Sequence, residues 1–251
     1  MLTRIESETI REISRQRLEE NNIAKLFIKQ VLTEGTLVLK RKVNFRKREN
    51  TEAVQAYCEM ELPEFAGINA RQKWANWRTI PKNLDGRIPS HPLRAIDLCC
   101  GTGDSTEVLA CYLPQGSTIL GLEFNPNFVS AARSRTYLDH QGKPARVGFR
   151  VQSVLETFRD ENGEPLANES VDLVNSCGAV GSHFDAASTR ALVREIARVL
   201  KTGGLATIDA GAPGTGKRQL IRIFRAHGFA VENITKSCAL DLFSQVCFRK
   251  L

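Results

Sequence analysis

Residues 94–104 read RAIDLCCGTGD, a short apolar run that ends in a turn with two glycines. The run has the length and composition of a buried β-strand. Glycine at 101 and 103 lets the backbone approach a ligand closely, because a Cβ there would occupy ligand space. A helix that begins after the turn would direct unpaired amide N–H groups at the same ligand. The segment therefore predicts a ligand-binding turn formed by Cys99, Gly101, Thr102 and Gly103.

The pattern that follows this turn alternates between apolar strands, turns and amphipathic helices. Such alternation is typical of an α/β fold built on a mostly parallel sheet. Together with the strand at 94–98, it predicts seven strands with helices on both faces of the sheet. We expect strands at 118–123, 147–151, 170–175, 205–210, 230–235 and 243–249, and helices at 105–113, 128–138, 188–200 and 218–227.

The N-terminal part of the chain has a different pattern. Residues 7–32 place apolar side chains at near-helical spacing and predict one or two amphipathic helices. We expect a short strand at 36–39 and a helix over 50–80 that Pro81 ends. The prediction is an N-terminal helical extension, residues 1–92, that acts as a cap or lid or forms a dimer contact, and a ligand-binding domain, residues 93–251.

Two carboxylates narrow the choice of ligand. Asp97 lies at the end of the first strand, where it would repel a pyrophosphate and attract an amino group. A dinucleotide-binding turn would also have a third glycine where Thr106 stands. Glu123 ends the second predicted strand and can accept hydrogen bonds from both hydroxyls of a ribose. Phe124, beside it, could pack on adenine.

These segments resemble the class I S-adenosylmethionine-dependent methyltransferases, and among them the small-molecule group of ubiquinone and menaquinone C-methyltransferases. The resemblance covers residues 93–251 and is carried by 96–104, 121–123 and 192–204. It implies a Rossmann-like fold, an enzyme that uses S-adenosyl-L-methionine, and a small-molecule acceptor. It also implies that Asp97, Gly101 and Gly103 surround the methionine end, that Glu123 holds the ribose, and that the loop beginning at Asn175 lies beside the sulfonium.

Three further site residues follow from position. Where the family commonly has an acidic residue near the adenine, this chain has Gln152-Ser153-Val154, so we expect Ser153 and Val154 at the adenine. His183 follows the fourth predicted strand and is the candidate catalytic residue, a general base, because imidazole accepts a proton near neutral pH.

Other features leave alternatives open. The formal charge is +7, and a basic cluster at 40–48 would suit an RNA-binding or RNA-modifying protein, although no aromatic stacking pattern accompanies it. A nicotinamide-dependent oxidoreductase could use the same sheet.

The segment 211–217 has phosphate-loop spacing but lacks the following Ser or Thr. Cys177 reads as a small buried thiol, and Trp74 and Trp77 as core or pocket residues.

Composition indicates the compartment. No apolar run approaches the length of a membrane helix, so we expect no membrane partner. The seven cysteines include no Cys-x-x-Cys pair, which argues against a zinc site or a disulfide framework. Reduced thiols fit a cytoplasmic protein. A homodimer is compatible with these features, and we expect no metal.

Overall fold

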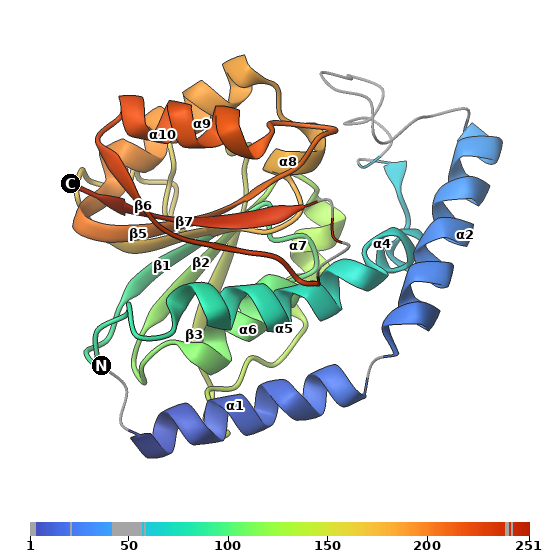
Figure 1. Ribbon diagram of the computed structural model, residues 1–251, viewed down its shortest axis with the longest axis horizontal. Helices are drawn as coiled ribbons and strands as arrows, with labels where there is room; N and C mark the ends of the chain where they lie inside the picture. Colours follow the sequence, from blue (N-terminus) through green and yellow to red (C-terminus); the bar gives the residue numbers. More distant parts are fainter. Residues whose placement is uncertain (1–3, 21, 42–56, 58, 239–240, 242) are drawn as a thin grey trace.

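The computed structural model describes residues 4–20, 22–41, 57, 59–238, 241 and 243–251. Its centre is a seven-stranded sheet with the order β3-β2-β1-β4-β5-β7-β6 and helices on both faces (Figure 1). The strands are β1 (Arg94–Leu98), β2 (Thr118–Glu123), β3 (Arg146–Val151), β4 (Val171–Ser176), β5 (Leu200–Ala210), β6 (Phe229–Thr235) and β7 (Ser244–Lys250). The predicted α/β fold is confirmed.

The direction of the strands locates a binding crevice. Strands β1 to β5 pair in parallel, and β7 runs antiparallel between β5 and β6. The strand order reverses beside β1, since β2 follows on one side and β4 on the other. In open parallel sheets a ligand binds at the carboxyl ends of the strands at such a reversal. The glycine turn after β1 lies at this point.

The two faces of the sheet are covered by helices with apolar inner sides. On one face α9 (Ala186–Val199) packs with β5, and α10 (Lys217–Ala226) packs with β6 and β7. On the other face α6 (Asp104–Tyr112) packs with β2 and β3. Helix α7 (Pro126–Arg133) is shorter than predicted, because the chain leaves the helix at Ser134. The following residues instead contact the glycine turn.

The N-terminal extension begins with two long helices. Helix α1 spans Arg4–Glu19 and α2 spans Ile23–Arg41. The side chain of Asn22 caps α2, since its Oδ1 accepts from the N–H groups of Ala24 and Lys25 at 3.0 and 3.2 Å. The predicted strand at 36–39 is wrong, because these residues continue α2. Leu37 and Leu39 lie on opposite sides of this helix, and Leu37 is buried whereas Leu39 is exposed.

Two further helices of the extension lie between α2 and β1 in the chain. Helix α4 spans Leu62–Ile68 and α5 spans Ala70–Leu84. The prediction that Pro81 ends the helix is wrong. The missing N–H of Pro81 removes a single hydrogen bond in the last turn, while Ile80 and Leu84 are fully buried beside β1 and α6 and hold the helix in place. Among the described residues, none of the helices combines the length and apolarity needed to cross a membrane.

Candidate functional site

A cavity of about 540 Å³ lies at the carboxyl ends of β1, β2 and β4. This volume falls within the usual range for a small-molecule site. Its floor comes from the loops that follow those strands and its roof from α4 and α5. The lining residues used below are Tyr57, Phe65, Gln72, Asn76, Cys99, Gly101, Asp104, Glu123, Phe124, Phe128, Ser153, Val154, Cys177, Gly178 and His183.

The glycine turn forms one wall of the cavity, but its glycines are needed for a different reason than the sequence predicted. Both have positive φ, 53° at Gly101 and 86° at Gly103. A Cβ on Gly101 would lie 2.7 Å from the ring of Phe65, and a Cβ on Gly103 would lie 2.0 Å from the hydroxyl of Tyr137. Aromatic side chains of this chain therefore fill the space that we assigned to the ligand. Gly101 lines the cavity, whereas Thr102 and Gly103 do not.

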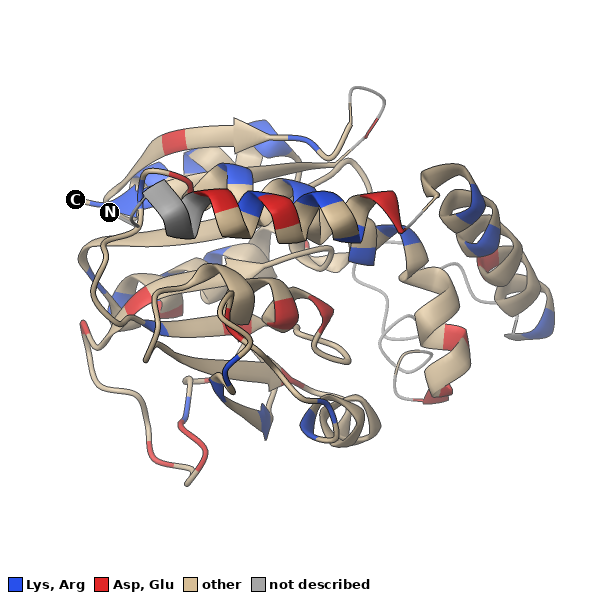
Figure 2. Ribbon diagram, turned by 90° about the horizontal axis from the view of Figure 1, so that it is seen from below, with Lys and Arg blue, Asp and Glu red and all other residues tan. Residues whose placement is uncertain are grey.

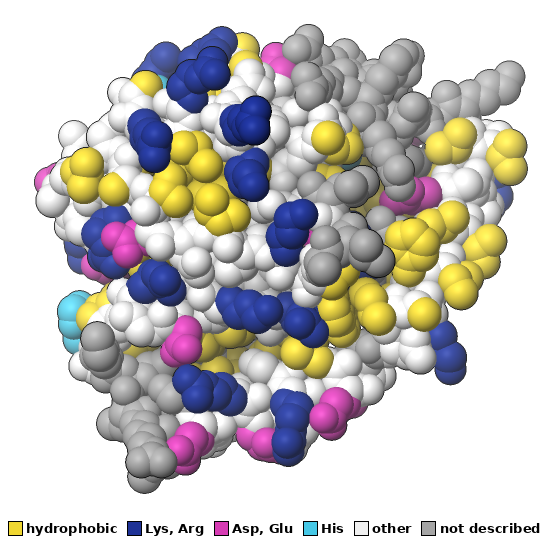
Figure 3. Space-filling model, in the orientation of Figure 1, with side chains coloured by type: hydrophobic (Ala, Val, Ile, Leu, Met, Phe, Trp, Pro, Cys, Tyr) yellow, Lys and Arg dark blue, Asp and Glu magenta, His cyan; other side chains and the backbone are white. Residues whose placement is uncertain are grey.

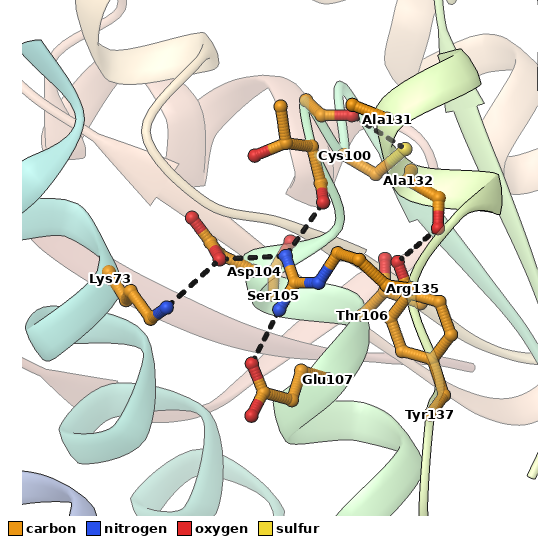
Figure 4. Close-up of polar contacts among 12 residues, drawn as sticks. Lys73, Cys100, Asp104, Ser105, Thr106, Glu107, Ala131, Ala132, Arg135 and Tyr137 are labelled. Atoms are coloured by element: carbon orange, nitrogen blue, oxygen red, sulfur yellow. Dashed lines mark hydrogen bonds and ion pairs between the residues drawn. The ribbon is translucent and has the colours of Figure 1, made fainter. Parts of the chain in front are cut away.

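Arg135 holds the back of this turn (Figure 4). Its guanidinium donates to the carbonyl of Thr102 at 2.7 Å and pairs with Asp104 at 2.8 Å and Glu107 at 2.6 Å. Lys73 of α5 lies 3.7 Å from the same Asp104 carboxylate. Asp104 thus presents a carboxylate to the cavity while two cations balance its charge. Sequence reasoning missed Arg135, because it placed residues 128–138 in a helix.

Asp97 lies behind the turn and does not line the cavity. Its side chain is fully buried, and one carboxylate oxygen accepts from Ser105 at 2.7 Å and Thr106 at 2.6 Å. The other accepts from the amide of Asn175 at 2.8 Å. Burial raises the pKa of Asp97, against these hydrogen bonds, which lower it. The carboxylate ties β1 to α6 and β4, and its contact with an amino group of a ligand stays a prediction.

Asn175 is also part of this buried network and not of the cavity wall. Its Oδ1 accepts from the hydroxyl of Thr207 at 2.8 Å, and it lies 3.3 Å from the amide of Gln245. Two residues further on, Cys177 and Gly178 do reach the cavity. Burial raises the pKa of the Cys177 thiol well above its usual value, so this side chain stays protonated and is not an activated nucleophile.

Glu123 reaches the cavity from the end of β2. The residue is 4% exposed, and its two carboxylate oxygens accept from the backbone N–H groups of Gly101 at 3.1 Å and Asn125 at 3.0 Å. Each oxygen keeps a lone pair for a further donor. Burial raises the pKa of Glu123, and the backbone hydrogen bonds oppose this shift. The side chain thus joins the glycine turn to the start of α7 and can still bind a diol.

The segment after β3 supplies the next part of the wall. Ser153 and Val154 line the cavity, and their contact with an adenine stays a prediction. The side chain of Gln152 is engaged elsewhere: its amide donates to the carbonyl of Thr157 at 2.7 Å and accepts from the N–H of Arg159 at 3.2 Å. Ser153 is therefore the side chain in this triplet that can accept a hydrogen bond from a ligand.

The roof contains residues that sequence reasoning did not identify. Phe65 of α4 packs on Phe128 of α7 with ring centroids 4.1 Å apart. Gln72 and Asn76 of α5 face the cavity and share a hydrogen bond of 2.8 Å. The spacing of these two residues, one helical turn, was visible in the sequence, but the pattern did not show which face of the helix meets the strand ends. Trp74 and Trp77 instead line a groove between α1 and α5.

His183 lies on the opposite side of the cavity, on the short helix α8 (Val180–His183). Buried Asp209 of β5 holds the start of α8, because its carboxylate accepts from the N–H groups of Val180 at 3.3 Å and Gly181 at 2.7 Å. The Nε2 of His183 is 3.2 Å from the hydroxyl of Tyr57. Its Nδ1 has no hydrogen-bond partner among the described residues. Burial lowers the pKa of His183 to about 4, so the imidazole is neutral at physiological pH.

This shift predicts a pH dependence of stability. Because the pKa of His183 is about 4 in the folded chain and 6.5 for an ordinary exposed histidine, the unfolded state binds the proton first as the pH falls. The stability that His183 contributes is complete above about pH 6.5 and declines by up to about 3 kcal/mol as the pH falls towards 4. Urea unfolding of the wild type and of His183→Gln across this range measures the difference. Parallel pH curves for the two proteins would contradict the buried, neutral imidazole.

Other sequence candidates lie away from the cavity. In the phosphate-loop-like segment 211–217, the hydroxyl of Thr215 lies 2.7 Å from that of Thr189 and the loop packs against α8. The basic cluster 40–48 falls mostly outside the described residues. Within the described part of the chain, no group of three His, Cys, Asp or Glu side chains could hold a metal ion.

Comparison with known proteins finds similarity to methyltransferases in the central part of the chain. Residues 95–204 match the model of a methyltransferase domain. The chain is 43% identical over 65 residues to a trans-aconitate 2-methyltransferase of Methylobacterium nodulans, a match that covers 25% of each protein. It is 29% identical over 114 residues to a demethylmenaquinone methyltransferase of Lactobacillus johnsonii, which covers 44% of this chain and 40% of that protein. The matched part is therefore well under half the length of either relative.

Solved structures share the fold at low sequence identity. A TehB-like SAM-dependent methyltransferase from Corynebacterium glutamicum superposes with a TM-score of 0.53 and 19% identity, covering 78% of this chain and 100% of that one. At this identity the likeness concerns the fold alone. Residues 95–204, which match the methyltransferase domain model, include the carboxyl ends of β1, β2 and β4 that carry the cavity.

Proposed function

We propose that the chain is a class I S-adenosylmethionine-dependent methyltransferase that binds S-adenosyl-L-methionine in the cavity beside β1 and β2, and the match of residues 95–204 to a methyltransferase domain supports this. The observation that carries this proposal is the position of Glu123. A buried carboxylate ends β2, hydrogen-bonds the glycine turn through Gly101, and faces a cavity of suitable volume. This is where a Rossmann-like fold holds the hydroxyls of a ribose.

The residues of the cavity fit the parts of that cofactor. We assign the ribose to Glu123 and the adenine to Phe124, Ser153 and Val154, which follow the ends of β2 and β3. We assign the methionine end to the backbone of Cys99 and Gly101 and to the carboxylate of Asp104, which can attract an amino group. The resemblance implied this last role for Asp97, whose oxygens accept hydrogen bonds from Ser105, Thr106 and Asn175.

For methyl transfer the protein mainly has to position the donor and the acceptor and to exclude water from the site. S-adenosyl-L-methionine supplies, when bound, a methyl group on a sulfonium that is already activated for displacement. Phe65 and Phe128 keep water from one side of the cavity, and Gln72 and Asn76 can orient a polar acceptor from the roof. His183, neutral at physiological pH, is the candidate to take a proton from an acceptor that arrives protonated.

We further propose that residues 1–92 form the cap on the acceptor side and that residues 93–251 form the cofactor-binding domain. The roof residues of α4 and α5 support the first part, because they face the cavity from outside the sheet. A cavity of this size suits a small-molecule acceptor and not a folded macromolecule. The six described cysteines are free, in keeping with a cytoplasmic location.

Ligand-induced stabilisation tests the proposal. S-adenosylhomocysteine, the product form of the cofactor, should raise the melting temperature of the full chain, and NAD should leave it unchanged. The reason for the second expectation is Thr106, a fully buried residue whose hydroxyl donates to Asp97 where a dinucleotide-binding turn has its third glycine. A shift with NAD alone would favour an oxidoreductase, and a shift with neither ligand would reject the cofactor assignment.

A further inference from the structure

The outward side of α2 carries a continuous row of exposed apolar side chains. Leu39 is 83% exposed, Leu32 66%, Ile28 57% and Phe27 55%, with Val31 and Val38 also exposed. Figure 3 shows hydrophobic side chains gathered over α2 at the right of the molecule. Single exposed apolar residues are ordinary, but six on one helix of 19 residues form a patch of the kind that marks an interaction surface. These six residues are called the outer face of α2.

The helix has three distinct sides. Its inner side contacts α4 and α5 and includes Leu37, which is 1% exposed and packs in a cluster with Met60, Phe65 and Ile68. With 3.6 residues per turn, the outer face occupies the next sector around the axis. The sector beyond it holds Lys25, Lys29 and Lys40, all exposed. The basic positions along α2 are visible at the right of Figure 2.

The charge beside the outer face indicates its partner. In α2 the acidic residue is Glu34, which is half-buried at the edge of the outer face that adjoins the inner side and accepts a hydrogen bond from Gln30 at 2.9 Å. Lysines therefore border the opposite edge of the apolar sector, without a carboxylate among them. In sequence, Arg41, Lys42 and residues 46–48 extend this positive charge. An apolar sector bordered by lysines is the pattern of a helix that lies in the interface of an anionic lipid bilayer.

We propose that the outer face of α2 binds an anionic lipid surface, with the helix parallel to the bilayer. The apolar side chains enter the acyl boundary and the lysines contact the headgroups. A second copy of this chain fits less well, because pairing two outer faces would bring rows of lysine close together with no acidic row opposite. The sequence argued against a membrane partner from the lack of a long apolar run, which addresses a spanning helix and not one lying in the interface.

Vesicle binding by the full chain tests this proposal. We expect the protein to co-sediment with vesicles of phosphatidylglycerol and phosphatidylcholine, and to do so at least about tenfold more weakly with phosphatidylcholine alone. Leu32→Glu should reduce binding to the mixed vesicles about tenfold or more. Ile234→Glu is the matched control, since Ile234 is an exposed apolar residue, 42% exposed, on β6. It should bind as the wild type does.

Further experiments distinguish binding to anionic lipid from binding to neutral lipid and from dimerisation. The double variant Lys25→Glu, Lys29→Glu should lose the preference for anionic vesicles, and thermal unfolding should show that every variant remains folded. Absence of wild-type binding to either vesicle, or equal loss in Leu32→Glu and Ile234→Glu, would overturn the proposal. So would a wild-type dimer that Leu32→Glu converts to a monomer without any effect of vesicles. None of these readouts depends on methyl transfer.

Discussion

Glu123→Ala is expected to weaken the binding of S-adenosylhomocysteine by about 1.5 to 3 kcal/mol, which corresponds to roughly a tenfold to hundredfold rise in Kd. The carboxylate is 4% exposed and is the proposed acceptor for the ribose hydroxyls. Hydrogen bonds to a buried charged group contribute more than those between neutral groups. Isothermal titration calorimetry with the wild type and the variant measures the difference.

The same substitution also affects the apo protein, so the two effects must be separated. Glu123 accepts from the N–H groups of Gly101 and Asn125, and its loss leaves both donors without this partner. A fall in melting temperature without ligand is therefore expected alongside the fall in affinity. Glu156→Ala serves as the control, because Glu156 is an exposed carboxylate in the loop after β3. Equal affinities for the wild type and Glu123→Ala would refute the proposed ribose contact.

The sheet could be predicted from the sequence because each strand is a local pattern. The strands at 94–98 and 118–123 were predicted at their exact bounds, and the others within a few residues, apart from an early start of β5 at Leu200. Buried parallel strands are nearly continuous apolar runs with turn residues at both ends, so they need little tertiary information. Glu123 and the glycine turn meet because parallel strands bring their carboxyl ends together.

The remaining features depend on contacts between distant segments. Pro81 lies inside α5 because burial of Ile80 and Leu84 against the sheet outweighs one missing hydrogen bond. Residues 36–39 have strand-like composition, yet Leu37 packs against Met60 and Phe65 only if the helix continues. The roof residues Gln72 and Asn76 could not be placed at the cavity, because helical periodicity does not say what a helix faces.

Asp97 shows the same limit at the site itself. The sequence located its carboxylate at the end of β1, which is correct, and gave it a ligand contact from that position. Whether the side chain meets a ligand depends on Ser105, Thr106 and Asn175, which enclose it. These three residues are at least eight positions from Asp97 in sequence. Their hydroxyl and amide groups do not form a pattern that one sequence reveals, so their contacts with Asp97 could not be predicted.

Gly103→Ala is expected to destabilise the protein by about 3 kcal/mol, for two reasons that can be measured separately. The first is backbone strain, because φ is 86° and alanine disfavours this region. The second is a collision, because the new Cβ would lie 2.0 Å from the hydroxyl of Tyr137. The nearest ring carbon, Cζ, would be 3.1 Å away, so removal of the hydroxyl relieves most of the collision and none of the strain.

A double-mutant cycle with Tyr137→Phe makes the separation. Tyr137→Phe alone removes a hydrogen bond of 3.0 Å to the carbonyl of Ala132 and should cost about 1 kcal/mol. In that background Gly103→Ala should cost at least about 1 kcal/mol less than in the wild type, because the collision is absent. Urea unfolding of the four proteins gives the coupling energy. Strictly additive effects would mean that Tyr137 does not occupy the space beside Gly103, and a ligand could then reach it after all.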